Sequence, residues 1–131
     1  MDEIQKMLAL KTWAVVGATN NQEKFGYKIF KFMKEAGFTV YPVNPGVSEV
    51  LGETCYPALQ DLPVKPDAVD FVVPASVGEK VMRDCAALGI KNVWLQPGAD
   101  APGVVKAAQE LGLTAVRACI MVESRKAGIG V

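Results

Sequence analysis

The chain has 131 residues, which suits one domain with a single core. Its 14 Lys and Arg balance its 14 Asp and Glu, and this zero net charge argues against nucleic-acid or membrane surfaces as partners, because both need a basic field. No apolar run reaches the length of a transmembrane helix and the N-terminus has no signal-peptide pattern, so we expect a cytoplasmic protein.

Histidine is absent, which removes the commonest general base and the commonest metal ligand. The three cysteines, Cys55, Cys85 and Cys119, match neither a disulfide framework nor a zinc pattern. We therefore expect reduced thiols, no metal site, no catalytic residues and no enzyme activity of the chain on its own.

The first quarter of the chain predicts a helix, a strand, a loop and a second helix. A short amphipathic helix is expected over residues 2–10, and the apolar run at 13–16 is typical of a central parallel strand. Gly17 and Gly26 bracket the loop, and Gly37 ends the helix that follows it. Such a loop aims free backbone N–H groups and the positive end of a helix at one point, which favours phosphate binding.

The rest of the chain alternates strands with helices. Strands are expected over 38–43, 68–73, 91–96 and 113–117, with weaker elements at 53–56, 58–63 and 119–126. One helix is expected to begin with Ser76 as its cap and to bury Val77, and the next to begin at Pro102 and bury Leu111. The alternation predicts the α/β class: a single Rossmann-like domain over residues 1–131, with a mostly parallel five-stranded sheet in the order 3-2-1-4-5 and helices on both faces.

Ligand sites in such folds gather at the carboxyl ends of the strands. Thr19 and Asn20 follow the first strand and are candidate donors to phosphate oxygens, while Lys24 adds a positive charge. A nicotinamide site usually has an acid after the second strand, where this chain has Asn44. That substitution weakens the prediction of an NAD site but leaves it open, because Asn44 can also bond a ribose.

Several segments together resemble the small stand-alone CoA-binding domain proteins (the CoA-binding-2 family), which are similar to the CoA-binding domain of the succinyl-CoA synthetase alpha subunit. The segments that carry the resemblance are 15–19, 24–27, 40–45, 51–57, 73–75 and 93–98. The resemblance covers nearly the whole chain and implies a non-catalytic domain that binds coenzyme A or an acyl-CoA.

The resemblance also implies a role for each loop. The CoA phosphates would lie in the first loop, at Gly17, Ala18, Thr19, Asn20, Lys24, Phe25 and Gly26. The adenosine would lie between two segments, Val43, Asn44 and Pro45 on one side and Val73, Pro74 and Ala75 on the other. The pantetheine arm would follow Gln96, Pro97 and Gly98 toward the cleft near Cys119.

Cys119 follows the last strand, and its position favours a buried structural cysteine; the alternative is a thiolate that Arg117 stabilises. If the pantetheine thiol reaches Cys119, oxidation would give a mixed disulfide with CoA. Two other functions stay open: an NAD(H)-binding oxidoreductase or redox-sensing domain, and a protein-interaction domain with a vestigial nucleotide pocket. A protein partner or a homo-oligomer stays open as well.

Overall fold

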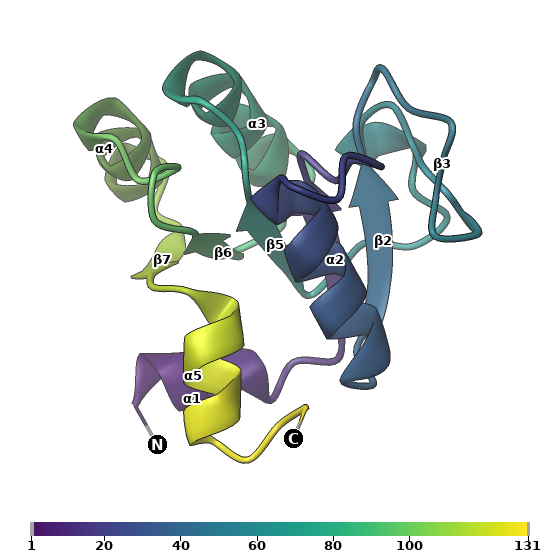
Figure 1. Ribbon diagram of the computed structural model, residues 1–131. Helices are drawn as coiled ribbons and strands as arrows, with labels where there is room; N and C mark the ends of the chain where they lie inside the picture. The colour runs from purple at the N-terminus through teal and green to yellow at the C-terminus, as the bar shows by residue number, and fades with distance from the viewer. Residues whose placement is uncertain (1, 131) are drawn as a thin grey trace.

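The computed structural model describes residues 2–130, and its centre is a five-stranded parallel sheet (Figure 1). The strands are β1 (Thr12–Val16), β2 (Thr39–Val43), β5 (Ala68–Phe71), β6 (Asn92–Leu95) and β7 (Thr114–Arg117). The helices are α1 (Glu3–Leu8), α2 (Phe25–Glu35), α3 (Ala75–Ala87), α4 (Pro102–Glu110) and α5 (Ile120–Lys126). A hairpin of β3 (Glu49–Val50) and β4 (Glu53–Thr54) and a 3-10 turn, η1 (Leu59–Asp61), lie between β2 and β5.

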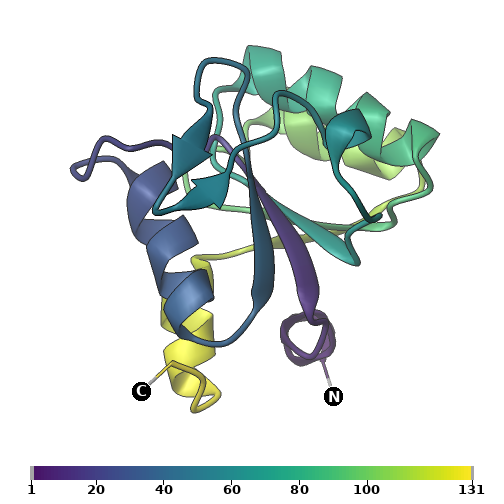
Figure 2. The ribbon, with the colours of Figure 1, turned by 90° about the vertical axis from the view of Figure 1, so that its right-hand side faces the viewer.

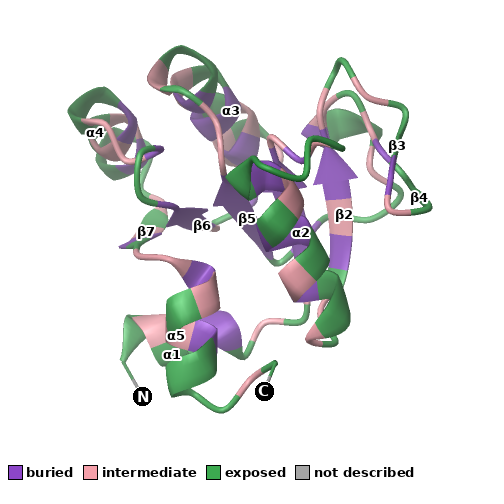
Figure 3. Cartoon of the chain, in the orientation of Figure 1, coloured by how far each residue is buried: buried purple, intermediate pink, exposed green. Residues whose placement is uncertain are grey.

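Helices cover both faces of the sheet (Figure 2). On one face α2 and α5 pack over a core that includes Trp13 and Trp94, and on the other α3 and α4 pack over a core that includes Phe71. Figure 3 shows the central strands β5 and β6 and the inward sides of the helices as mostly buried. Because successive strand residues point to opposite faces, a strand covered on both sides must be apolar throughout, which explains the continuous run in β1.

The α/β Rossmann-like class is confirmed, but the predicted strand order 3-2-1-4-5 is wrong. The sheet has the order β2-β1-β5-β6-β7, which is 2-1-3-4-5 when its five strands are counted along the chain. Proline lacks the N–H that a central strand must donate to both neighbours, so Pro42 favours the edge position of β2. On the outer side of this edge strand, the Pro42 carbonyl accepts a 3.0 Å hydrogen bond from the Tyr56 N–H. All four residues of β5 are buried, as expected of a strand paired on both sides.

The limits of several elements also differ from the prediction. Ser76 does not cap α3, because Pro74 precedes that helix and Ser76 lies inside its first turn. Val77 and Leu111 are 42% and 40% exposed instead of buried, the first beside a cleft and the second at the end of α4. Residues 53–56 contribute only β4, which pairs with the unpredicted β3, and α5 forms the helix expected within 119–126.

The predicted domain spans residues 1–131, of which Met1 and Val131 lie outside the described range. Within residues 2–130, no helix combines the length and the apolar character needed to cross a membrane. The same residues contain no group of three or more Cys, Asp or Glu side chains arranged to hold a metal ion.

Candidate functional site

Two glycines allow the first loop to fold against the sheet. Gly17 directly follows β1 with φ of 101°, a left-handed conformation that favours glycine, and a Cβ there would collide with the carbonyl oxygen of Val72. A Cβ on Gly26, in the first turn of α2, would collide with the carbonyl oxygen of Gly17. The two glycines therefore bring the start of α2, the end of β1 and the segment after β5 into direct backbone contact.

The loop between these glycines leaves the first turn of α2 open. The side chain of Asn21 accepts a 3.1 Å bond from the Glu23 N–H, and Lys24 at the N-cap makes no side-chain capping bond. The N–H groups of Tyr27 and Lys28 donate to the Lys24 carbonyl, so the N–H groups of Phe25 and Gly26 keep no acceptor within residues 2–130. These free donors, with the helix dipole, suit an anion.

A second helix begins at the same edge of the sheet. Pro74 precedes α3 without a side-chain cap, and its carbonyl accepts bonds from the Val77 and Gly78 N–H groups at 3.1 and 2.8 Å. The N–H groups of Ala75 and Ser76 are thus the open donors of this helix. Because β1 and β5 are neighbours in the sheet, α2 and α3 both direct a positive end toward the groove at the carboxyl edge.

Three clefts adjoin one another along this edge. The central cleft, of about 460 Å³, is lined by Gly17, Thr19, Glu23, Lys24, Phe25, Gly26, Asn44, Val72, Val73 and Pro74. The β2 cleft, of about 390 Å³, is lined by Val16, Gly17, Val43, Asn44, Pro45, Pro57, Ala58, Leu59, Val73, Val77, Lys80, Val81 and Asp84. The β6 cleft, of about 270 Å³, is lined by Phe25, Val72, Val73, Pro74, Gln96, Pro97, Gly98, Ala99 and Cys119.

Shared residues make these clefts one groove. Val73 lines all three, Gly17 and Asn44 join the central cleft to the β2 cleft, and Phe25 and Pro74 join it to the β6 cleft. The β2 and β6 clefts are mainly apolar, whereas the central cleft has the loop, Lys24 and the two open helix ends. A ligand that fits the whole groove therefore has an anionic middle and two less polar ends.

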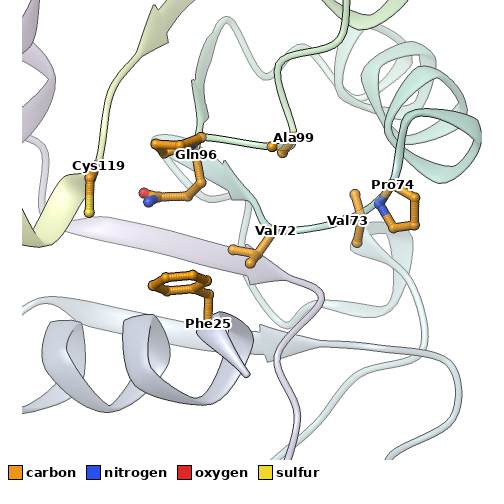
Figure 4. A pocket seen from close by; sticks show the side chains of 9 residues that line it. Phe25, Val72, Val73, Pro74, Gln96, Ala99 and Cys119 are labelled. Atoms are coloured by element: carbon orange, nitrogen blue, oxygen red, sulfur yellow. The ribbon is translucent and has the colours of Figure 1, made fainter. Parts of the chain in front are cut away.

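The β6 cleft has one exposed aromatic wall and one fixed polar group (Figure 4). Phe25 is 59% exposed at its mouth, and the buried Gln96 uses its side-chain oxygen to accept a 3.1 Å bond from the Ile120 N–H. In Figure 4 the Gln96 amide and the Cys119 sulfur both point toward the space that the Phe25 ring borders. The cleft can hold a narrow chain with a few polar groups.

Asp70 is the functional candidate that the sequence reasoning missed. It lies in the middle of β5 with no exposed surface, and neither of its carboxylate oxygens has a hydrogen-bond partner within residues 2–130. Burial raises the pKa of Asp70 well above its ordinary value, and the nearby charge of the Cys119 thiolate raises it further. An acidic residue within an otherwise apolar strand was the signal in the sequence.

Most of the predicted site residues border the groove, but three do not. Ala18 is buried, and its carbonyl accepts a 2.9 Å bond from the Asn44 amide. Asn20 donates through its amide to the Glu49 carbonyl at 2.8 Å, so it ties the loop to the β3–β4 hairpin instead of facing the central cleft. Ala75 begins α3 outside the residues that line the clefts.

One further prediction about side chains needs correction, and one residue of the groove was not predicted. Arg117 does not pair with Cys119, because its guanidinium lies 3.4 Å from the Asp100 carboxylate. The groove also includes Lys80, which was not predicted and pairs with Asp84 at 3.2 Å on the border of the β2 cleft. Lys80 lies three residues after Val77 on α3, so the helical spacing would have indicated it once Val77 was recognised as exposed.

Comparison with known proteins identifies relatives for most of this chain. Residues 11–125 match the family described as the CoA binding domain. An ADP-forming acetate–CoA ligase II of Archaeoglobus fulgidus is 36% identical over 92 residues, which cover 69% of this chain and 14% of the ligase. The protein YneT of Bacillus subtilis is 26% identical over 92% of this chain and 90% of its own length.

Solved structures agree with these relatives. A protein from Pyrococcus horikoshii has a TM-score of 0.89 and 35% identity, covering 95% of this chain and 89% of its own. A dinucleotide-forming acetyl-coenzyme A synthetase of Ca. Korarchaeum cryptofilum has a TM-score of 0.71 and 28% identity, and the likeness spans 88% of this chain but only 27% of the synthetase. The fold, the loops and these matches show that the chain belongs to the CoA-binding domain family and is homologous to domains of acetate–CoA ligases.

Proposed function

We propose that this chain binds coenzyme A or an acyl-CoA along the groove and acts as a binding module without chemistry of its own. The observation that carries the proposal is the order of the clefts: a central cleft with two open helix ends lies between two mainly apolar clefts. Coenzyme A has the same order of parts, since its diphosphate joins an adenosine to a pantetheine arm.

Each part of the ligand has a proposed position. The adenosine would lie in the β2 cleft between Pro45 and Val73, because a flat base needs apolar walls. The diphosphate would lie in the central cleft, where N–H groups of α2 and α3 donate and Lys24 supplies charge. The pantetheine arm would follow the β6 cleft between Phe25 and Gln96.

The relatives suggest what such a module serves. The acetate–CoA ligases that match are much longer than this chain, which spans 14% of one from Archaeoglobus fulgidus and 18% of a Pyrococcus furiosus alpha subunit. Because that relative is named as a subunit, we propose that this chain also acts with a protein partner, which would supply any reaction of the bound acyl-CoA. The cytoplasmic location of this chain stays a prediction.

The alternative of an NAD(H) site depends on Asn44, whose side chain is held by two hydrogen bonds within the protein. The Asn44 amide nitrogen donates to the Ala18 carbonyl at 2.9 Å, and its side-chain oxygen accepts a 3.0 Å bond from the Gly46 N–H. These bonds use one of its two N–H groups and one lone pair of its oxygen, and Asn44 has no negative charge with which to replace the acid that a nicotinamide site uses.

Isothermal titration calorimetry under reducing conditions tests the proposal. We expect saturable binding of CoA and acetyl-CoA, weaker binding of ADP and of pantetheine, which each fill part of the groove, and no binding of NAD. Saturable binding of NAD or NADH without a response to CoA would contradict the proposal. Binding of no ligand in this set would favour the third function, an interaction domain with a vestigial pocket.

A further inference from the structure

The β2 cleft includes two charged side chains that the proposed position of the adenosine does not require. Lys80 and Asp84 of α3 line this cleft, and apart from Asn44 the other side chains at its wall are apolar. An adenine base and an unmodified ribose have no charge, so apolar walls and a few hydrogen bonds are enough to hold them. A lysine in this cleft therefore suits a ligand that has an anion at its adenosine end.

Helical spacing brings Lys80 to the cleft. Val77, Lys80, Val81 and Asp84 recur at helical spacing, so they form one stripe of α3 that faces the cleft. The Lys80 ammonium lies 3.2 Å from the Asp84 carboxylate, one turn toward the C-terminal end of the helix. Long side chains on a helix usually lean toward its N-terminus. Rotation of the flexible lysine stem would therefore move the ammonium along the stripe toward Val77 and the open end of α3.

The ion pair between Lys80 and Asp84 holds the lysine weakly. The Lys80 side chain is 69% exposed, so water screens the pair and the contact stabilises the helix little. The lysine also precedes the acid, which is the less favourable order for a pair four residues apart on a helix. A stronger anion in the cleft can therefore take the ammonium from Asp84 at little cost.

The cations of the groove match the anionic parts of coenzyme A in number and order. Among the residues within 2–130 that line the three clefts, Lys24 is the cation of the central cleft, Lys80 is that of the β2 cleft, and the β6 cleft has none. CoA has its diphosphate in the middle, a phosphate on the 3′ oxygen of its ribose and no charge along the pantetheine arm. The reverse direction of binding would bring the ribose phosphate to the cleft without a cation.

We propose that Lys80 binds the phosphate on the ribose of the adenosine, and that this contact makes the groove select coenzyme A over nucleotides that lack this phosphate. The inference rests on the proposed CoA function. A phosphate monoester has about 1.5 to 2 negative charges at neutral pH and three acceptor oxygens, so it attracts the ammonium more strongly than the Asp84 carboxylate does. The carboxylate that stays behind repels the phosphate and limits the gain in affinity.

Calorimetry with CoA and dephospho-CoA tests the assignment, because these two ligands differ solely in the ribose phosphate. We expect the wild type to bind CoA about tenfold more tightly, as for a hydrogen bond between charged groups. Lys80→Gln should bind CoA as weakly as dephospho-CoA, with its affinity for dephospho-CoA unchanged. Arg83→Gln removes the same charge from an exposed position of α3 outside the clefts, and it should keep the preference of the wild type.

Asp84→Asn tests the competition for the ammonium. Without the carboxylate Lys80 is free and the repulsion is gone, so we expect this variant to bind CoA about two- to fivefold more tightly, the range that corresponds to an exposed ion pair. Its affinity for dephospho-CoA should stay that of the wild type. If Asp84→Asn binds CoA no more tightly than the wild type, Lys80 does not change partners and the proposal is wrong.

The remaining outcomes separate this inference from the proposed function. Equal affinity of the wild type for CoA and dephospho-CoA would overturn the role of Lys80 and leave the CoA function in place, whereas binding of neither ligand would contradict both. Equal losses of both ligands in Lys80→Gln would show a general effect of the substitution and would also refute the assignment. NADP has its ribose phosphate on the 2′ oxygen, and we expect it not to bind. Binding of NADP that depends on Lys80, without a response to CoA, would assign the phosphate to the wrong ligand and sink both proposals.

Discussion

Gly26 lies against the carbonyl oxygen of Gly17, so closely that a methyl group on Gly26 would collide with it. Eight residues separate the two glycines, and their contact fixes where α2 begins relative to β1. The open helix end and the loop owe their positions to this contact. The first glycine also has a positive φ, so a bulky residue at Gly17 would strain the backbone as well as alter the groove.

Replacing Gly26 by alanine should therefore destabilise the fold. We expect Gly26→Ala to lower the free energy of unfolding by about 1–3 kcal/mol, the usual cost of overpacking, in urea denaturation followed by circular dichroism. Gly46→Ala is the matched control: its φ is not positive, and its new methyl group would meet only the Asn44 side chain at 3.7 Å. Equal stability of the two variants would contradict the close contact.

Lys24 should contribute to ligand binding through its charge. Lys24→Gln is expected to weaken CoA binding about tenfold in calorimetry, as for a lost hydrogen bond to a charged group. Lys31→Gln, on the exposed side of the same helix and outside the groove, should bind CoA as the wild type does. If both substitutions weaken binding equally, the effect is one of net charge and Lys24 has no special position.

Gln96 should stabilise the turn into α5. Gln96→Ala leaves the buried Ile120 N–H without its acceptor, which should cost about 1–3 kcal/mol of the free energy of unfolding. The exposed Gln109 of α4 provides the comparison, since Gln109→Ala should change stability by less than about 0.5 kcal/mol. Chemical denaturation of both variants measures the difference, and a neutral Gln96→Ala would show that water replaces the lost bond.

Asp70 should make stability depend on pH in a direction unusual for a carboxylate. Its pKa is raised in the folded protein, whereas in the unfolded chain it has its ordinary value of about 4. Between these two pKa values the native state binds more protons than the unfolded state. The contribution of Asp70 to stability is then fully favourable below pH 4 and falls as the pH rises through that window. The free energy of unfolding of the wild type minus that of Asp70→Asn should fall from pH 4 to pH 7. A difference that rises with pH would refute the raised pKa of Asp70.

The sequence was sufficient for the alternation of strands and helices because apolar runs, glycines and prolines mark most of the elements locally. The strand order required one further step, recognising that Pro42 excludes β2 from the interior of the sheet. The partners of Asn20 and Arg117 could not be predicted in this way. Each depends on a residue far along the chain, Glu49 and Asp100, and no local pattern specifies such pairs.

The same property of Pro42 affects how copies of this protein can associate. Along the outer side of β2, the Pro42 carbonyl accepts from the Tyr56 N–H, and the Asn44 N–H donates to the Tyr56 carbonyl at 2.9 Å. This part of the edge is occupied by the chain itself, and Pro42 has no N–H to offer. An incoming strand finds few groups to pair with there, so β2 is protected against the edge-to-edge growth by which exposed sheets aggregate.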